Sequence, residues 1–124
     1  MIFKESLLSV FDNTGVKLVK CIHFDGSRRK GAKIGSIILV SVQKSMPKVK
    51  LKKSEKAVHY KKGFISKGVI IHTKKFLNRK RSGDSSVKFN KNSVILLDKR
   101  LLPLGSRILV PVTREIRYLN FFKF

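Results

Sequence analysis

The sequence has 124 residues, and its 29 lysines and arginines against 7 aspartates and glutamates give a formal net charge of +22. The length suits one domain, and a hydrophobic share of 42% excludes a chain that is disordered by composition. A small body with this charge repels itself and attracts polyanions, so we expect a negatively charged partner, most commonly a nucleic acid.

The cysteine content, the apolar runs and the first residues of the chain exclude other classes of protein. The single cysteine, Cys21, excludes an internal disulfide and a zinc site built on paired cysteines. Apolar runs such as Ile37–Val40 are far shorter than the ~18 residues of a membrane-spanning helix. Met1–Ser6 has neither the basic segment nor the apolar run of a secretory signal. We therefore expect no membrane partner and a protein that works in the compartment where it is made.

The first half of the chain alternates short apolar segments with turn residues. Ser6–Phe11 and Val16–Phe24 are expected strands, and the Asp12–Gly15 segment between them consists of turn-forming residue types. The imperfect alternation of the second strand indicates burial on both sides or a bulge. After a basic loop that contains two glycines, Ile34–Gln43 is a third expected strand.

The second half of the chain shows the same pattern with shorter segments. The expected strands are Lys67–Thr73, Val87–Phe89, Val94–Leu97 and Ser106–Val110, and the expected helix is Arg114–Phe122. Short strands at this spacing predict a mainly β protein built as a small antiparallel β-barrel with a short C-terminal helix.

The positive charge is uneven along the chain. Lys44–Arg81 contains 14 basic residues and a single acid, Glu55, and Gly26–Lys33 is a second basic loop. Glycines allow the backbone to approach RNA closely, and lysine or arginine neutralises the phosphates. The alternative is a solvated basic surface, which the overall charge disfavours. The candidate RNA-binding residues are Lys17, Lys20, Arg28, Arg29, Lys30, Lys33, Lys48, Lys50, Lys52, Lys53, Lys74, Lys75, Arg79, Lys80, Arg81, Lys88 and Arg107.

The aromatic residues, the cysteine, the histidines and the carboxylates give weaker indications of function than the basic loops do. Tyr60, Phe64 and Phe76 lie among basic residues and could stack on unpaired bases, or they could pack within the protein. Cys21 and His23 lack the further ligands that a metal site needs. The carboxylates mostly lie in turns, and no catalytic triad or phosphate-binding glycine loop is present. We therefore expect no cofactor, no metal and no enzymatic activity.

A series of short segments follows a distinctive order: Leu8–Gly15, Cys21–Ile22, Gly26–Arg29, Ile34–Ile38, Met46–Pro47, His72–Lys75, Val87–Phe89, Leu104–Ile108 and Pro111–Arg117. Together they resemble the universal large-subunit ribosomal protein fourteen family, in its bacterial and organellar type, over nearly the whole chain. The D-N-T-G turn, the G-S-R-R loop and the closing P-V-T-R-E-I-R carry most of the resemblance.

The resemblance implies a five-stranded antiparallel barrel that is a structural constituent of the large ribosomal subunit. It also implies binding to large-subunit rRNA, an inter-subunit bridge to the small-subunit rRNA, and contacts with the large-subunit proteins numbered three and nineteen. A ribosome-silencing factor can bind this family near its T-R-E segment. The corresponding bridge or partner residues are Thr113, Arg114, Glu115 and Arg117.

The chain also departs from the family pattern. We expect one domain over residues 1–124 with a basic insertion near residues 54–66, and Val110 stands where the family usually has glycine. The absence of a secretory signal and a bias toward residues with AT-rich codons favour a mitochondrial matrix ribosome, with a plastid or bacterial cytoplasm as alternatives. The competing function is a free cationic nucleic-acid-binding barrel outside the ribosome.

Overall fold

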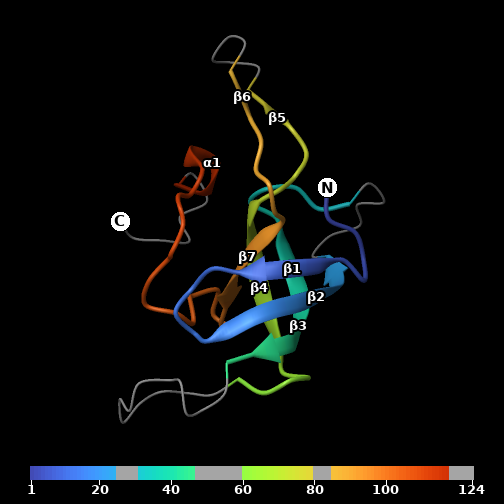
Figure 1. Cartoon of the computed structure of the whole chain (residues 1–124), viewed down its shortest axis with the longest axis vertical. Coiled ribbons are helices and arrows are strands. Elements are labelled where there is room, and N and C mark those ends of the chain that lie inside the picture. The colour runs from blue at the N-terminus through green and yellow to red at the C-terminus, as the bar shows by residue number, and fades with distance from the viewer. Residues whose placement is uncertain (25–30, 47–59, 80–84, 118–124) are drawn as a thin grey trace.

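A computed structural model describes residues 1–24, 31–46, 60–79 and 85–117 of the chain. The fold is mainly β, with a short helix near the C-terminal side and a small hairpin that projects from the barrel (Figure 1). The elements are β1 (Leu7–Val10), β2 (Val16–Phe24), β3 (Ile37–Ser45), β4 (Ile65–His72), β5 (Leu77–Asn78), β6 (Ser86–Val87), β7 (Ser93–Leu97) and α1 (Arg114–Arg117).

Five strands close into a barrel in the order β1-β2-β3-β4-β7, which confirms the predicted mainly β, five-stranded barrel. Four of the pairings are antiparallel, whereas β1 and β7 pair in parallel. The expected antiparallel arrangement therefore differs at the seam that closes the barrel. The reason is topological, because strand directions cannot alternate all the way around a ring with an odd number of strands.

Inward-facing side chains of the five strands fill the barrel. Val19 and Cys21 on β2 and Val40 and Val42 on β3 are fully buried at two-residue spacing, as the alternation of a strand requires. The register of β2 against β3 shifts at several steps, one of them between Cys21 and His23. The irregularity predicted for this strand is therefore present as a bulge-like shift in its pairing.

The strands β4 and β7 are buried on both faces. Val69, Ile70 and Ile71 are each fully buried, and so is every residue of β7. Ile70 faces the barrel interior, whereas Val69 and Ile71 belong to a second apolar cluster. This second cluster also contains Ile116, the buried residue of α1. The C-terminal segment is thus held against the barrel by the outer faces of β4 and β7.

Two predicted strands do not join the barrel. The segment predicted at Val87–Phe89 instead pairs with Leu77–Asn78 in the small β5–β6 hairpin. The segment predicted at Ser106–Val110 makes one bridge, from Ile108 to Asp12, and is otherwise irregular. A closed barrel leaves no free edge on which these segments could pair.

Other boundaries differ more modestly from those predicted. Helix α1 is described as far as Arg117, and the remainder of the predicted helix lies outside the described residues. Residues 54–59 of the expected insertion also lie outside them. Ile65 and Ser66, at the end of that insertion, are the first residues of β4. Val110 packs against the second apolar cluster.

The turn between β1 and β2 ties together three parts of the chain. The buried carboxylate of Asp12 accepts hydrogen bonds from the Thr14 amide at 3.1 Å, from the Thr14 hydroxyl, and from the Leu96 amide of β7 at 3.3 Å. Asn13 donates to the Ser106 hydroxyl at 2.6 Å and accepts from the Arg107 amide at 3.2 Å. This turn therefore connects β1, β7 and the C-terminal segment.

We expect Asp12→Asn to destabilise the fold by about 1–3 kcal/mol, because the new amide group leaves one buried N–H without its acceptor. Urea unfolding measures the change. Asp98→Asn is the matched control, since Asp98 is exposed and its replacement removes the same charge. We expect the control to change stability by less than about 0.5 kcal/mol; equal losses in the two variants would show that charge, and not the hydrogen bonds, is responsible.

Candidate functional site

Four exposed lysines gather around one end of the barrel. The pairing of Ile37 with Val69 places the start of β3 beside the end of β4, so the loop before β3 and the loop after β4 meet there. A stacked contact between His72 and Phe89, with ring centroids 3.9 Å apart, brings the segment after β6 to the same end. We call the four lysines the basic end; they are Lys33, Lys74, Lys75 and Lys88.

The backbone of the basic end is held in place by hydrogen bonds. The Lys33 amide donates to the Ser36 hydroxyl at 3.2 Å, and the Lys33 carbonyl accepts from the Ser36 amide at 3.0 Å. On the facing loop, the Lys74 amide donates to the Asn92 side chain at 2.9 Å. Lysine side chains that start from a fixed backbone lose less conformational entropy when they bind an anion.

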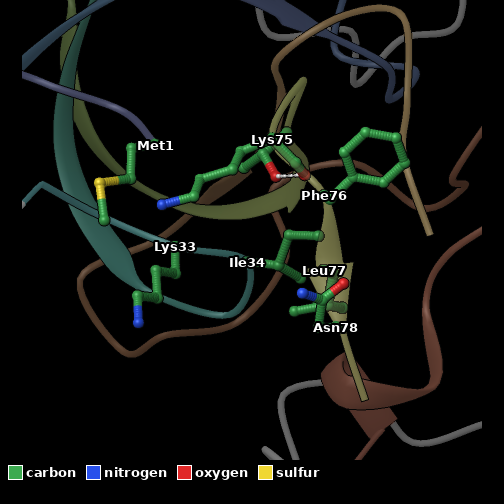
Figure 2. A pocket seen from close by; sticks show the side chains of 8 residues that line it. Met1, Lys33, Ile34, Lys75, Phe76, Leu77 and Asn78 are labelled. Atoms are coloured by element: carbon green, nitrogen blue, oxygen red, sulfur yellow. Dashed lines mark hydrogen bonds between the residues drawn. The ribbon is translucent and has the colours of Figure 1, made fainter. Parts of the chain in front are cut away.

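A pocket of about 180 Å³ lies at the basic end, between the loop before β3 and the segment that joins β4 to β5 (Figure 2). Two lysines of the basic end contribute to its walls, and the lining contains no acidic residue. The lining residues are Met1, Lys33, Ile34, Thr73, Lys75, Phe76, Leu77 and Asn78.

The three aromatic candidates for base stacking have different surroundings. Tyr60 packs against the barrel core, and burial raises the pKa of its hydroxyl. Phe64 lies 5.0 Å from the Tyr60 ring, centroid to centroid, and is 40% exposed. Phe76 is 58% exposed, and the Lys88 ammonium lies 5.0 Å from the centre of its ring. Of the three, Phe76 is the ring that combines exposure with a neighbouring cation.

Other predicted RNA-binding residues lie away from the basic end. Lys17 lies at the start of β2, and Arg107 is hydrogen-bonded to the turn that precedes β2. The loop before β3, which carries Lys33, adjoins the opposite end of β2. Lys20 pairs with Glu5 at 2.5 Å, so its charge is compensated within the chain. The remaining predicted positions lie outside the described residues; they are Arg28, Arg29, Lys30, Lys48, Lys50, Lys52, Lys53, Lys80 and Arg81.

Arg79 and Glu115 pair with each other. The Arg79 Nε donates to Glu115 Oε1 at 2.6 Å, and the Arg79 Nη2 donates to Glu115 Oε2 at 3.2 Å. This two-point contact joins the loop side of the β5–β6 hairpin to α1. From the sequence, Arg79 was assigned to RNA binding and Glu115 to the bridge or partner residues, and nothing there indicated that the two residues, 36 positions apart, pair with each other.

The other residues of the predicted partner segment divide between two sides of α1. Thr113 and Ile116 are buried, whereas Arg114 and Arg117 are exposed. A spacing of three residues places each pair on one side of a helix. His72 supports the approach to this helix, because its Nε2 forms a 2.7 Å hydrogen bond with the Pro111 carbonyl.

Hydrogen bonding from Arg79 lowers the pKa of the Glu115 carboxyl below its ordinary value, although partial burial opposes the shift. Because the folded protein favours the ionised form, this carboxylate stabilises the fold above the ordinary glutamate pKa of ~4.3. The stabilisation is lost as the pH falls through the lowered pKa.

Neither a metal centre nor a helix able to cross a membrane is found in the described part of the chain. Cys21 is a buried free cysteine, and burial raises the pKa of its thiol. This residue is consistent with a packing role in the barrel core.

Sequence reasoning missed the apolar and amide lining of the pocket, formed by Ile34, Leu77 and Asn78. These residues come from two separated segments. Their residue types are ordinary for strands and loops, so no local signal in the sequence distinguishes them.

We expect Glu115→Gln to lower the unfolding temperature at pH 7 and to have a smaller effect at an acidic pH below the lowered pKa of the wild-type carboxyl. Thermal unfolding followed at both pH values measures this difference. Arg79→Gln should reproduce the loss at pH 7, and the double variant should add little to either single change. A Glu115→Gln effect of the same size at both pH values would contradict this account of the pair.

A comparison with profiles of protein families matches the chain to ribosomal protein L14p/L23e over residues 1–124. The match covers the whole sequence, including the barrel, the β5–β6 hairpin and α1. The protein therefore belongs to the ribosomal protein L14p/L23e family, whose members have a structural role in the large ribosomal subunit.

Proposed function

We propose that the protein binds large-subunit rRNA through the basic end of its barrel. The observation that carries this proposal is the uncompensated charge of Lys33, Lys74, Lys75 and Lys88. Among the described residues, none of these four lysines forms an ion pair with an acidic side chain. The basic end therefore presents several positive charges whose repulsion a bound polyanion would relieve.

The proposed binding is electrostatic and depends on position more than on base sequence. Each lysine that meets a phosphate releases condensed counterions, which favours binding at low salt. Most contacts of this kind fix the orientation of a protein on the RNA and carry little sequence information. The hydrogen-bonded loops of the basic end support such a role, because they project the lysines from a closed barrel.

The second part of the proposal concerns α1. We infer that Arg114 and Arg117 contact the small-subunit rRNA in an inter-subunit bridge, supported by their exposure on one side of the helix. Arginine can hold a phosphate through two parallel hydrogen bonds. Family membership also supports neighbouring proteins of the three and nineteen types and a silencing factor as partners. The bias toward residues with AT-rich codons favours a mitochondrial ribosome.

A free nucleic-acid-binding barrel is the alternative function. Sedimentation of a cell lysate at ~150 mM salt separates the two, since loosely bound cationic proteins lose orders of magnitude in affinity at that salt concentration. We expect the protein to sediment in a one-to-one ratio with the large subunit. A distribution across messenger fractions or free protein would favour the alternative.

We expect Lys74→Ala/Lys88→Ala to reduce the salt dependence of binding to large-subunit rRNA, with the slope of log K against log salt smaller by about 2. Filter binding at several salt concentrations measures the slope. Lys62→Ala/Lys99→Ala is the matched control, because both lysines are exposed in turns away from the basic end. An equal reduction in the control would mean that net charge alone determines binding, which would contradict the assignment to the basic end.

We expect Arg114→Ala/Arg117→Ala to impair the joining of purified large and small subunits, because two phosphate contacts of the bridge are removed. Light scattering measures the joining, and thermal unfolding of the isolated protein measures stability. Lys99→Ala/Arg100→Ala removes the same charge from an exposed turn and should leave joining intact. A loss of stability as large as the loss of joining would contradict a bridging role.

A further inference from the structure

The pocket at the basic end combines three chemical features in one small space. Lys33 and Lys75 supply positive charge, Ile34 and Leu77 supply apolar surface, and Asn78 supplies an amide group. In Figure 2, Lys75 extends toward Met1 and Lys33, while Ile34, Leu77 and Asn78 lie together beside them. The charged and apolar parts of the pocket are thus adjacent but separate.

The charged side of the pocket favours an anion. The pocket lining contains two lysines and no acidic residue, and neither lysine belongs to an ion pair with a described acidic side chain. Two ammonium groups beside the same pocket repel each other. A phosphate bound between them would attract both, and this attraction would outweigh their mutual repulsion. Lysine binds phosphate as a point charge, so this arrangement requires no fixed geometry.

The size of the pocket limits what can enter it. Its volume is about 180 Å³, below the ~300–1,000 Å³ of pockets that enclose a whole small molecule. A fragment of a polymer fits this limit better than a free ligand, because the rest of the polymer can be bound elsewhere on the protein. Unpaired bases of RNA are commonly received on apolar or aromatic side chains in this way.

The amide of Asn78 adds a means of recognising the occupant. A side-chain amide has both donors and an acceptor, which match the hydrogen-bonding edge of a nucleobase. The Thr73 hydroxyl, also in the lining, already donates to the Lys75 carbonyl at 3.3 Å. That hydrogen bond holds the loop from which Lys75 projects, so the lysine starts from an ordered position.

We propose that this pocket receives one unpaired nucleotide of the large-subunit rRNA. Its base contacts Ile34 and Leu77, its edge meets Asn78, and its phosphate lies between Lys33 and Lys75. The inference rests on the proposed rRNA binding and adds to it a specific site for a single nucleotide. Phe76 also lines the pocket, and its ring, which points away from Lys33 and Lys75 in Figure 2, can stack on a neighbouring base.

Ultraviolet crosslinking of intact large subunits, followed by mass spectrometry of the peptides, tests the proposal. We expect a nucleotide adduct on the peptide that contains Lys75–Asn78. Subunits that give RNA adducts on other peptides of this protein, but none on this peptide or on the Lys33–Ile34 peptide, would overturn the pocket and leave the proposed function standing. The absence of RNA adducts anywhere on the protein would overturn both.

Variants separate the pocket from general charge. In subunits that carry Lys33→Ala/Lys75→Ala, we expect the pocket adduct to fall by about tenfold, as a loss of one or two phosphate contacts implies. Asn78→Asp keeps the shape of the side chain but adds a negative charge, so it should reduce the same adduct. Adducts elsewhere on the protein should persist in both variants.

The control is again Lys62→Ala/Lys99→Ala, which removes two exposed charges outside the pocket. It should leave the pocket adduct unchanged. An equal fall in the control, or an unchanged adduct in both pocket variants, would overturn the proposal. Thermal unfolding of each purified variant shows whether a loss of adduct arises from a loss of the fold.

Discussion

The buried carboxylate of Asp12 is the interaction on which the arrangement of the chain depends. It holds the turn that reverses the chain between β1 and β2, and it also accepts a hydrogen bond from the backbone of β7. Gly105 lies so close to this turn that a Cβ atom on it would be 2.6 Å from Asn13 Oδ1. The turn therefore packs directly against the segment that leads to α1, and a change there reaches both the barrel seam and the helix.

Three of the four acidic residues in the described part of the chain bind other groups of the protein. Asp12 is buried in its turn, Glu5 compensates Lys20, and Glu115 holds Arg79. These acids orient strands, the hairpin and α1, and they leave the lysines of the basic end without acidic partners among the described residues. The same distribution that secures the fold thus concentrates uncompensated charge where we propose that RNA binds.

Much of the fold follows from local patterns. Val16–Phe24 was predicted with the observed bounds, and the turn at Asp12–Gly15 has the positive φ at Gly15 that its composition suggests. The continuous apolar run at Val94–Leu97 is typical of a strand buried on both faces, which β7 is. Ser106–Val110 was misassigned because its alternation serves to cover the second apolar cluster, and alternation alone does not distinguish that role from strand pairing.

The candidate site was less predictable than the fold. Its lysines were identified as candidates because basic loops are visible in a sequence, but their grouping was not. Lys33 and Lys75 are far apart in the chain, and the pairing of β3 with β4 brings their loops together. For Arg79 and Glu115 the sequence suggested external partners for both residues. The structure instead shows that the hairpin and α1 meet and that the two side chains bind each other.

The sequence by itself determined the strand-forming segments, the turns, the excess of positive charge and the family, because these depend on residue type and short-range order. Only the tertiary structure decided the parallel seam, the hairpin outside the barrel, the pairing of Arg79 with Glu115, and the pocket between Lys33 and Lys75. Each of these is a meeting of segments distant in the chain. Such meetings depend on how a closed barrel orders its strands, and residue type alone does not specify that order.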